Sequence, residues 1–224
     1  MLLVIPKVLG PESVASLRTR LAELEFHDGK ETARGSAQRV KANRQLTASN
    51  PDAAKLAQEV VNALSSHVAF SAATLPKQIV LPMFSRYADG EHYGKHLDVP
   101  VMGRAPKQVR TDISVTVFLS DPGEYEGGEL RLHVHGGTRS VKADAGDVFI
   151  YPSNTLHEVT PVASGERWVA VTWIQSLVAD ALRREVLFDL ATTLRRVEAR
   201  EGQDEEVLNL RKCHYNLLRM WAEA

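Results

Sequence analysis

The feature that most constrains the fold is a change in hydrophobic period near residue 78. From there to about residue 177 the chain runs through short stretches rich in β-branched and aromatic residues, separated by glycine, proline and aspartate turns. The expected strands are Ile79–Tyr87, Ile113–Leu119, Glu129–Val134, Asp147–Tyr151, His157–Pro161 and Trp168–Ile174. Short strands at this spacing are typical of a β-sandwich or a barrel. The middle of the chain is therefore predicted to be a β core.

Helical periodicity flanks this core on both sides. The expected helices are Pro11–Leu24, Pro51–Val68, Leu182–Leu194 and Val207–Trp221. Asn50 stands where it can cap the free amides of the second of these helices. The predicted organisation is an N-terminal helical segment (1–77) that packs on the core, a central β domain (78–177) and a C-terminal helical segment (178–224). The C-terminal helices either pack on the core, which is the default, or build a homo-oligomer interface.

The segment between the first two helices has a different composition. Gly29–Thr47 is polar and basic and has few apolar anchors, which predicts a loop that covers a site. Its basic part, residues 34–44, either helps to form a substrate entrance or is simply solvated.

Charge and cysteine content exclude several classes of protein. A net charge of −1 argues against a nucleic-acid-binding surface driven by counterion release. Cys213 is the single cysteine, so an intrachain disulfide and a thiolate-rich zinc site are impossible. No apolar run approaches the roughly 20 residues that cross a bilayer. We therefore expect a cytoplasmic protein with neither a nucleic-acid nor a membrane partner.

Two histidines and one aspartate form the most informative pattern in the chain. In an extended segment, residues two positions apart project to the same face, so His96 and Asp98 can reach one metal ion. His157 comes from a separate predicted strand and can complete the set. Two imidazoles and a carboxylate on one face of an octahedral ion are the ligands of non-heme Fe(II) oxygenases, which keep the other face open.

Other histidines compete for the same role. A lone His-x-Asp pair is more often an exposed turn or a hydrogen-bonded pair than a metal site. His92 stands four residues before His96, and His133 with His135 could chelate from one strand face. Because Gly136 follows directly, we expect this second pair to lie near an exposed hairpin end.

Arg167 begins a valine-rich predicted strand ten residues after His157. A guanidinium that points into such a barrel would be a buried unpaired charge, which is costly, so it needs an anionic partner. A ligand carboxylate would satisfy the two-pronged geometry that arginine favours. The alternatives are a protein carboxylate, such as Glu158 or Glu166, and an orientation toward solvent.

Several motifs together resemble those of the Fe(II)- and 2-oxoglutarate-dependent dioxygenases. The matching stretches are FSRYADGEHYGKHLD (84–98), RTDISVTVFLSDP (110–122), GGEL (127–130), AGDVFIYPS (145–153), TLHEVTP (155–161), WIQS (173–176) and HYNLLRMW (214–221). More narrowly, the chain resembles the bacterial PKHD-type hydroxylases, relatives of the prolyl 4-hydroxylases that are often associated with iron-uptake genes. The resemblance extends over essentially the whole chain.

This resemblance implies a double-stranded β-helix, a jelly-roll barrel with the metal at its mouth. It also implies that His96, Asp98 and His157 bind iron and that Arg167 pairs with the distal carboxylate of 2-oxoglutarate. Tyr87 is similar in position to a tyrosine that prolyl hydroxylases place near the co-substrate. Some relatives have a tyrosine hydroxyl where this chain has a phenylalanine, Phe118, and the hydroxyls that could replace it are those of Ser114, Thr116 and Thr172.

The activity implied is hydroxylation of an unknown prime substrate with O2, coupled to oxidative decarboxylation of 2-oxoglutarate to succinate and CO2. One Fe(II) per subunit and L-ascorbate are the implied cofactors, and a peptidyl side chain or a siderophore-like metabolite is the implied substrate class, with a link to iron homeostasis. The alternatives are a non-catalytic iron or 2-oxoglutarate sensor and a cupin-like metalloenzyme on the same barrel.

Overall fold

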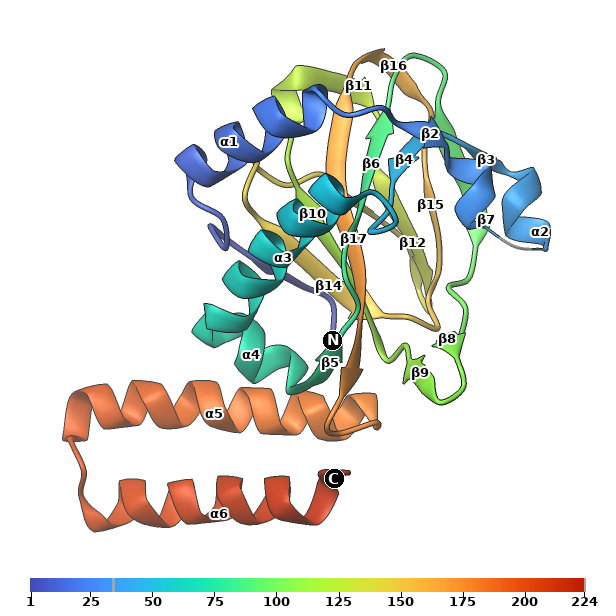
Figure 1. The fold of residues 1–224 in the computed structure, drawn as a ribbon. Helices are drawn as coiled ribbons and strands as arrows, with labels where there is room; N and C mark the ends of the chain where they lie inside the picture. Colours follow the sequence, from blue (N-terminus) through green and yellow to red (C-terminus); the bar gives the residue numbers. More distant parts are fainter. Residues whose placement is uncertain (34, 224) are drawn as a thin grey trace.

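Two antiparallel sheets form the centre of the molecule in a computed structural model, which describes residues 1–33 and 35–223 (Figure 1). The larger sheet has the order β1 (Leu3–Ile5), β14 (Val148–Pro152), β10 (Ile113–Phe118), β17 (Arg167–Ser176), β6 (Met83–Tyr87), β4 (Arg44–Leu46) and β2 (His27–Asp28), and β5 (Pro76–Ile79) also pairs with β17. The smaller sheet has the order β13 (Gly137–Val141), β12 (Leu130–Val134), β15 (Leu156–Val159), β7 (His92–His96) and β3 (Lys41–Ala42). Two ribbons complete the β structure, β11 (Tyr125–Gly127) with β16 (Val162–Gly165) and β8 (Val101–Arg104) with β9 (Lys107–Arg110).

The central strands of the larger sheet are buried on both faces. Since successive side chains of a strand point to opposite faces, each such strand contributes to two different clusters. In β10 the cluster under the helices takes Ile113, Val115 and Val117, whereas Phe118 packs in the cluster between the two sheets. In β14 the same division puts Val148 and Ile150 under the helices and Phe149 and Tyr151 between the sheets. This alternation also decides which side chains can line a site between the sheets.

Helices cover the outer face of the larger sheet and extend beyond one end of it (Figure 1). They are α1 (Pro11–Ala22), α3 (Pro51–Ser66), α4 (Val68–Thr74), α5 (Ala181–Glu201) and α6 (Glu205–Trp221), the last of which packs on α5. The short α2 (Ser36–Arg39) lies apart from them, beside β7 of the smaller sheet (Figure 1). Asn50 Oδ1 accepts hydrogen bonds from the backbone amides of Asp52 and Ala53, so this residue caps α3 as its position indicated. None of the described helices combines the length and the apolar character needed to cross a membrane.

The prediction of a mainly β core with flanking helices is confirmed. Strands β1 to β4 come from the first 46 residues; β1, β3 and β4 pair with strands of the central segment, and β2 pairs with β4. The division into three segments with boundaries near residues 77 and 177 stays a prediction.

The prediction of a loop over Gly29–Thr47 is wrong in part. The segment contains a 3-10 turn (Gly29–Thr32), α2, β3 and β4, and its strands pair with β7 and β6. The buried side chains at Lys41, Asn43 and Gln45 are polar, so the strands show no apolar alternation from which they could be recognised. Backbone pairing with two sheet edges, rather than apolar burial, orders this segment.

Candidate functional site

A pocket of about 700 Å³ opens between the two sheets. This volume lies in the range of small-molecule binding sites. Strands of both sheets line it, together with the segment 32–45 and the β8–β9 hairpin. The segment that the sequence analysis expected to cover a site therefore does contribute to the wall of one.

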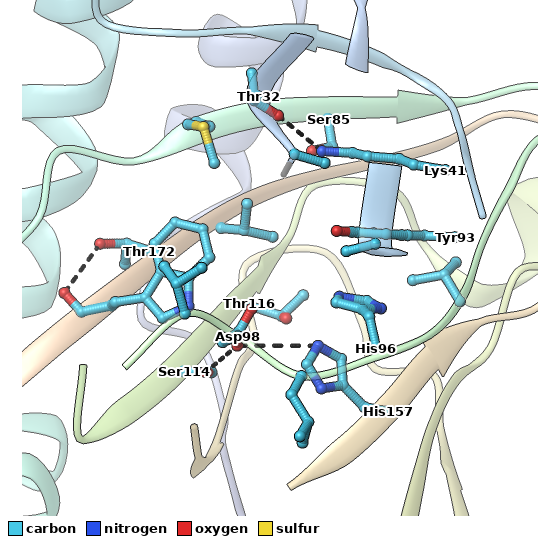
Figure 2. Close-up of a pocket in the computed structure, with 18 of the residues that line it drawn as sticks. Thr32, Lys41, Ser85, Tyr93, His96, Asp98, Ser114, Thr116, His157 and Thr172 are labelled. Atoms are coloured by element: carbon cyan, nitrogen blue, oxygen red, sulfur yellow. Dashed lines mark hydrogen bonds and ion pairs between the residues drawn. The ribbon is translucent and has the colours of Figure 1, made fainter. Parts of the chain in front are cut away.

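His96, Asp98 and His157 meet in the wall of this pocket (Figure 2). His96 ends β7 and stands in register with His157 on the neighbouring strand β15, and Asp98 follows two residues after His96. One possible ligand atom of each residue lies within 4.8 Å of those of the other two. Asp98 Oδ2 is 3.9 Å from His157 Nε2. The structure thus brings together the three residues that the sequence pattern selected.

Backbone carbonyls orient both imidazoles. His96 Nδ1 lies 2.8 Å from the carbonyl oxygen of Gly94, and His157 Nδ1 lies 2.9 Å from that of Thr155. Since a carbonyl can only accept, each Nδ1 carries the proton, and each Nε2 keeps a lone pair for a metal ion. Burial and the neighbouring His157 lower the pKa of His96 to about 4, so this imidazole is neutral near pH 7.

A hydroxyl pair holds the carboxylate. Ser114 Oγ donates to Asp98 Oδ2 and lies 2.8 Å from Ser153 Oγ. Such outer partners fix the direction of a ligating carboxylate. Two oriented imidazoles and one positioned carboxylate, all in the wall of one pocket, fit an Fe(II) ion that keeps positions open for other ligands.

The competing histidines lie elsewhere. His133 Nε2 is 3.0 Å from Glu158 Oε1, and its strand leads into the turn at Gly136, where φ is +96°. His92 Nδ1 is 3.1 Å from the carbonyl oxygen of Gly90. Neither residue belongs to the group of possible ligands formed by the described residues around His96.

Arg167 lines the same pocket and is only 2% exposed. The two carboxylates considered as its partners are used by other groups. Glu166 Oε1 lies 3.7 Å from Arg86 Nε, and Glu158 pairs with His133. Within residues 1–33 and 35–223, Arg167 forms no ion pair, and its Nε is buried without a hydrogen-bond partner. Its guanidinium is therefore a buried cation that lacks a protein counterion.

Aromatic rings surround this guanidinium. Its Cζ lies 5.1 Å from the ring centroid of Tyr87 and 5.8 Å from that of Phe118. Burial raises the pKa of Tyr87, and the charge of Arg167 partly offsets this effect, so the phenol stays protonated. Burial also raises the pKa of Tyr125, and the charge of Arg167 lowers it. The Tyr125 Oη is buried without a hydrogen-bond partner in the part of the chain that the structure describes.

The three other hydroxyls considered for this region differ in how they are used. Ser114 donates to Asp98, and Thr172 Oγ1 donates to the carbonyl oxygen of Val80. Thr116 lines the pocket and is buried. The sequence analysis did not select Tyr125, because its strand pairs with β16 and no local pattern relates it to Arg167.

Two further residues of the pocket wall also escaped the sequence analysis. Lys41 and Tyr93 lie on the paired strands β3 and β7, directly opposite each other in the register. Tyr93 stacks on His96 with 3.5 Å between ring centroids. Regular alternation would put residues three apart on opposite faces, so the sequence contains no signal for Tyr93; an irregularity in the pairing of β7 with β15, where His157 pairs with His96 and Val159 with Tyr93, accompanies their contact. The sequence around Lys41 contains no signal either, because its strand is short and polar.

Two family models match the chain. The 2OG-Fe(II) oxygenase superfamily matches residues 82–175, and the PKHD-type hydroxylase C-terminal domain matches residues 180–223. A curated relative, the PKHD-type hydroxylase YbiX of Escherichia coli O7:K1, is 42% identical over 220 residues, which are 98% of either chain.

Solved structures of similar fold include prolyl hydroxylases and proteins with 2-oxoglutarate bound. A Pseudomonas putida prolyl-4-hydroxylase has a TM-score of 0.52 at 20% identity, over 78% of this chain and 92% of that one. HygX from Streptomyces hygroscopicus, with nickel, 2-oxoglutarate and hygromycin B bound, has a TM-score of 0.54 at 17% identity, over 79% of this chain and 84% of that one. At these identities the likeness concerns the fold alone, and it confirms the expected jelly-roll barrel.

Proposed function

Because the chain belongs to the PKHD-type hydroxylases of the 2-oxoglutarate- and Fe(II)-dependent oxygenase superfamily, we propose that His96, Asp98 and His157 bind its Fe(II) and that Arg167 binds 2-oxoglutarate. The observation that supports this assignment is that a cluster of possible metal ligands and a buried cation line the same pocket. Three ligand-type side chains converge on one point, and a buried guanidinium forms no ion pair with the described residues.

Each residue has a distinct task. The two Nε2 atoms and the carboxylate hold the metal, while Arg167 receives the distal carboxylate of the co-substrate in a two-pronged contact and so fixes its direction. Tyr87 contacts the co-substrate beside Arg167, and its protonated hydroxyl can donate a hydrogen bond. Once bound, Fe(II) and 2-oxoglutarate supply the oxidising chemistry, in which one atom of O2 enters the substrate as hydroxyl and the other enters succinate as CO2 leaves.

The co-substrate pocket differs from that of relatives with a tyrosine at the position of Phe118. Tyr125, whose pKa is raised by burial and partly lowered by the charge of Arg167, supplies the missing hydroxyl in our proposal. It is favoured over Ser114 and Thr172, whose hydroxyls already donate to protein acceptors, and Thr116 is the remaining alternative.

The prime substrate is a peptidyl side chain or a siderophore-like metabolite. Fold neighbours named as a prolyl-4-hydroxylase and as HygX with hygromycin B bound support keeping both a peptidyl and a small-molecule substrate in the proposal. A role in iron homeostasis, a requirement for ascorbate and a cytoplasmic location complete the proposal.

The decisive assay measures succinate from 2-oxoglutarate with purified protein and Fe(II), together with O2 consumption. Turnover, even uncoupled from a prime substrate, supports the assignment. A charge-transfer band with Fe(II) and 2-oxoglutarate under anaerobic conditions, but no O2 consumption with any candidate substrate, would instead indicate a sensor. Absence of the band would indicate a cupin-like site that does not use 2-oxoglutarate.

A further inference from the structure

Lys41 is a second buried cation of the pocket, and the proposed chemistry does not use it. It is 4% exposed, and its Nζ donates to Thr32 Oγ1 at 2.8 Å and to Gln45 Oε1 at 2.9 Å. Both acceptors are neutral, and Lys41 forms no ion pair among the residues that the structure describes. An ammonium has three donors, so one is left over. A buried charge without a counterion is costly unless a ligand provides one.

This ammonium stands one aromatic ring away from the candidate metal centre. Lys41 Nζ lies 4.8 Å from the ring centroid of Tyr93, whose other face stacks on His96 at an interplanar angle of 14°. Figure 2 shows Lys41, Tyr93 and His96 in that order in the pocket wall. A group bound at Lys41 would therefore lie within one small molecule's length of the metal.

Lys41 and Arg167 occupy separate parts of the pocket. Arg167 begins β17 in the larger sheet, beside Tyr87 and Phe118. Lys41 lies on β3 in the smaller sheet, and its Nζ partners are Thr32 and Gln45, the latter on β4, which β6 separates from β17 in the larger sheet. Because Arg167 and Lys41 come from different sheets, each can bind its own anion at the same time. The co-substrate takes the anion site at Arg167, which leaves the site at Lys41 for another molecule.

The charge of the whole pocket favours anions. Among the residues that the structure describes, its lining contains four permanently or mostly cationic side chains and one carboxylate, that of Asp98. The cations are Lys41, Lys95, Arg104 and Arg167. The chain as a whole has a net charge of −1, so positive charge is concentrated here rather than spread over the surface. Such focusing attracts an anionic substrate.

We propose that the prime substrate carries a carboxylate that binds the Lys41 ammonium and thereby positions the carbon to be hydroxylated over the metal centre. This inference rests on the proposed function, because it assigns Arg167 to the co-substrate. The apolar part of the substrate packs against Tyr93 and against Val101 and Met102 of the β8–β9 hairpin, which line the same pocket.

The test uses matched probes that differ only in charge. Protein loaded with Zn(II) and 2-oxoglutarate, which does not turn over, is titrated with two pairs and followed by ligand-observed NMR. One pair is N-acetyl-L-proline and its primary amide. The other is the peptide Ac-Ala-Pro-Glu-Ala-NH2 and its glutamine counterpart. The first pair represents small carboxylates and the second represents acidic peptides.

Wild-type protein should bind the carboxylate member of at least one pair about tenfold or more tightly than the neutral member, as expected for a charge-assisted hydrogen bond. Lys41→Met should abolish this preference. Lys41→Gln, which keeps a donor without the charge, should do the same and serves if methionine disturbs the fold. The control Lys107→Met removes a positive charge from β9 outside the pocket lining and should leave the preference intact.

Three outcomes would overturn the proposal. The first is equal binding of both members of both pairs by wild-type protein. The second is a preference that survives both Lys41 variants. The third is a loss of 2-oxoglutarate binding in Lys41→Met, seen in the anaerobic Fe(II) charge-transfer band, since Lys41 would then belong to the co-substrate site. If wild-type protein shows no such band, the proposed function fails instead, whatever the probes do.

Discussion

Replacing Arg167 by methionine should weaken co-substrate binding without a matching loss of stability. The guanidinium is buried, forms no ion pair among the described residues and has an Nε without a partner. In the ligand-free protein its desolvation therefore lowers stability, and no ion pair offsets this effect. Methionine keeps an unbranched apolar stem and adds no polar group. The free energy of unfolding of the ligand-free variant should therefore equal or exceed that of the wild type.

Binding of 2-oxoglutarate should respond in the opposite sense. Removing one partner of a buried, hydrogen-bonded charge pair costs roughly 2–5 kcal/mol, which corresponds to a Kd higher by roughly thirtyfold to several thousandfold. A ligand at a hundred times its Kd stabilises a protein by about 2.7 kcal/mol, or about 5–10 °C in Tm for a chain of this size. The wild type should show this rise with Fe(II) and 2-oxoglutarate, and Arg167→Met should show at most about a third of it at the same concentration.

The assay combines anaerobic titration of the Fe(II) charge-transfer band with thermal unfolding in the presence and absence of 2-oxoglutarate. Arg86→Met is the matched control, because Arg86 lies on the adjacent strand β6 but does not line the pocket. Suppose that Arg167→Met unfolds several degrees below the wild type yet binds 2-oxoglutarate with unchanged affinity. Arg167 would then be a structural residue, and the reasoning from its missing counterion would be refuted.

Three further predictions concern the metal ligands, Lys41 and the backbone. Asp98→Ala should abolish Fe(II) binding. Ser114→Ala, which removes the donor to Asp98, should weaken Fe(II) binding about ten- to a hundredfold. An unchanged affinity of either variant in a metal titration would contradict the role of that residue. Burial lowers the pKa of Lys41 to about 8, so its ammonium is charged below this pH and neutral above it. The preference for a carboxylate probe should thus fade as the pH rises through about 8, and a constant preference across that range would count against an ionic contact. Gly146→Ala should lower the free energy of unfolding in urea by about 1–3 kcal/mol, because φ is +93° there and a Cβ would lie 2.2 Å from the carbonyl oxygen of Leu9; wild-type stability would disprove this.

Much of the candidate site could be predicted because its residues are coupled within single strands. The two-residue spacing of His96 and Asp98, and the place of Arg167 at the start of a valine-rich strand, each predict which face a side chain takes. The local pattern could not say whether Arg167 meets a protein carboxylate. That depends on the partners of Glu158 and Glu166, which lie across other strands.

The residues that escaped prediction share one property. Lys41 meets Tyr93 through the pairing of β3 with β7, and Tyr125 lies by Arg167 through the packing of a separate ribbon. These juxtapositions join positions far apart in the chain and leave no trace in local periodicity. The segment around Lys41 adds a second obstacle, since its buried side chains are polar.

Local patterning in the chain was enough to predict the β core and the flanking helices and to make His96, Asp98 and His157 candidate metal ligands, because hydrophobic period and strand alternation are properties of neighbouring residues. Three-dimensional packing was needed to leave Arg167 and Lys41 as buried cations without ion pairs among the described residues, one on each sheet of the same pocket. Whether a charge is compensated depends on every group that surrounds it, and those groups come together only when distant strands pair.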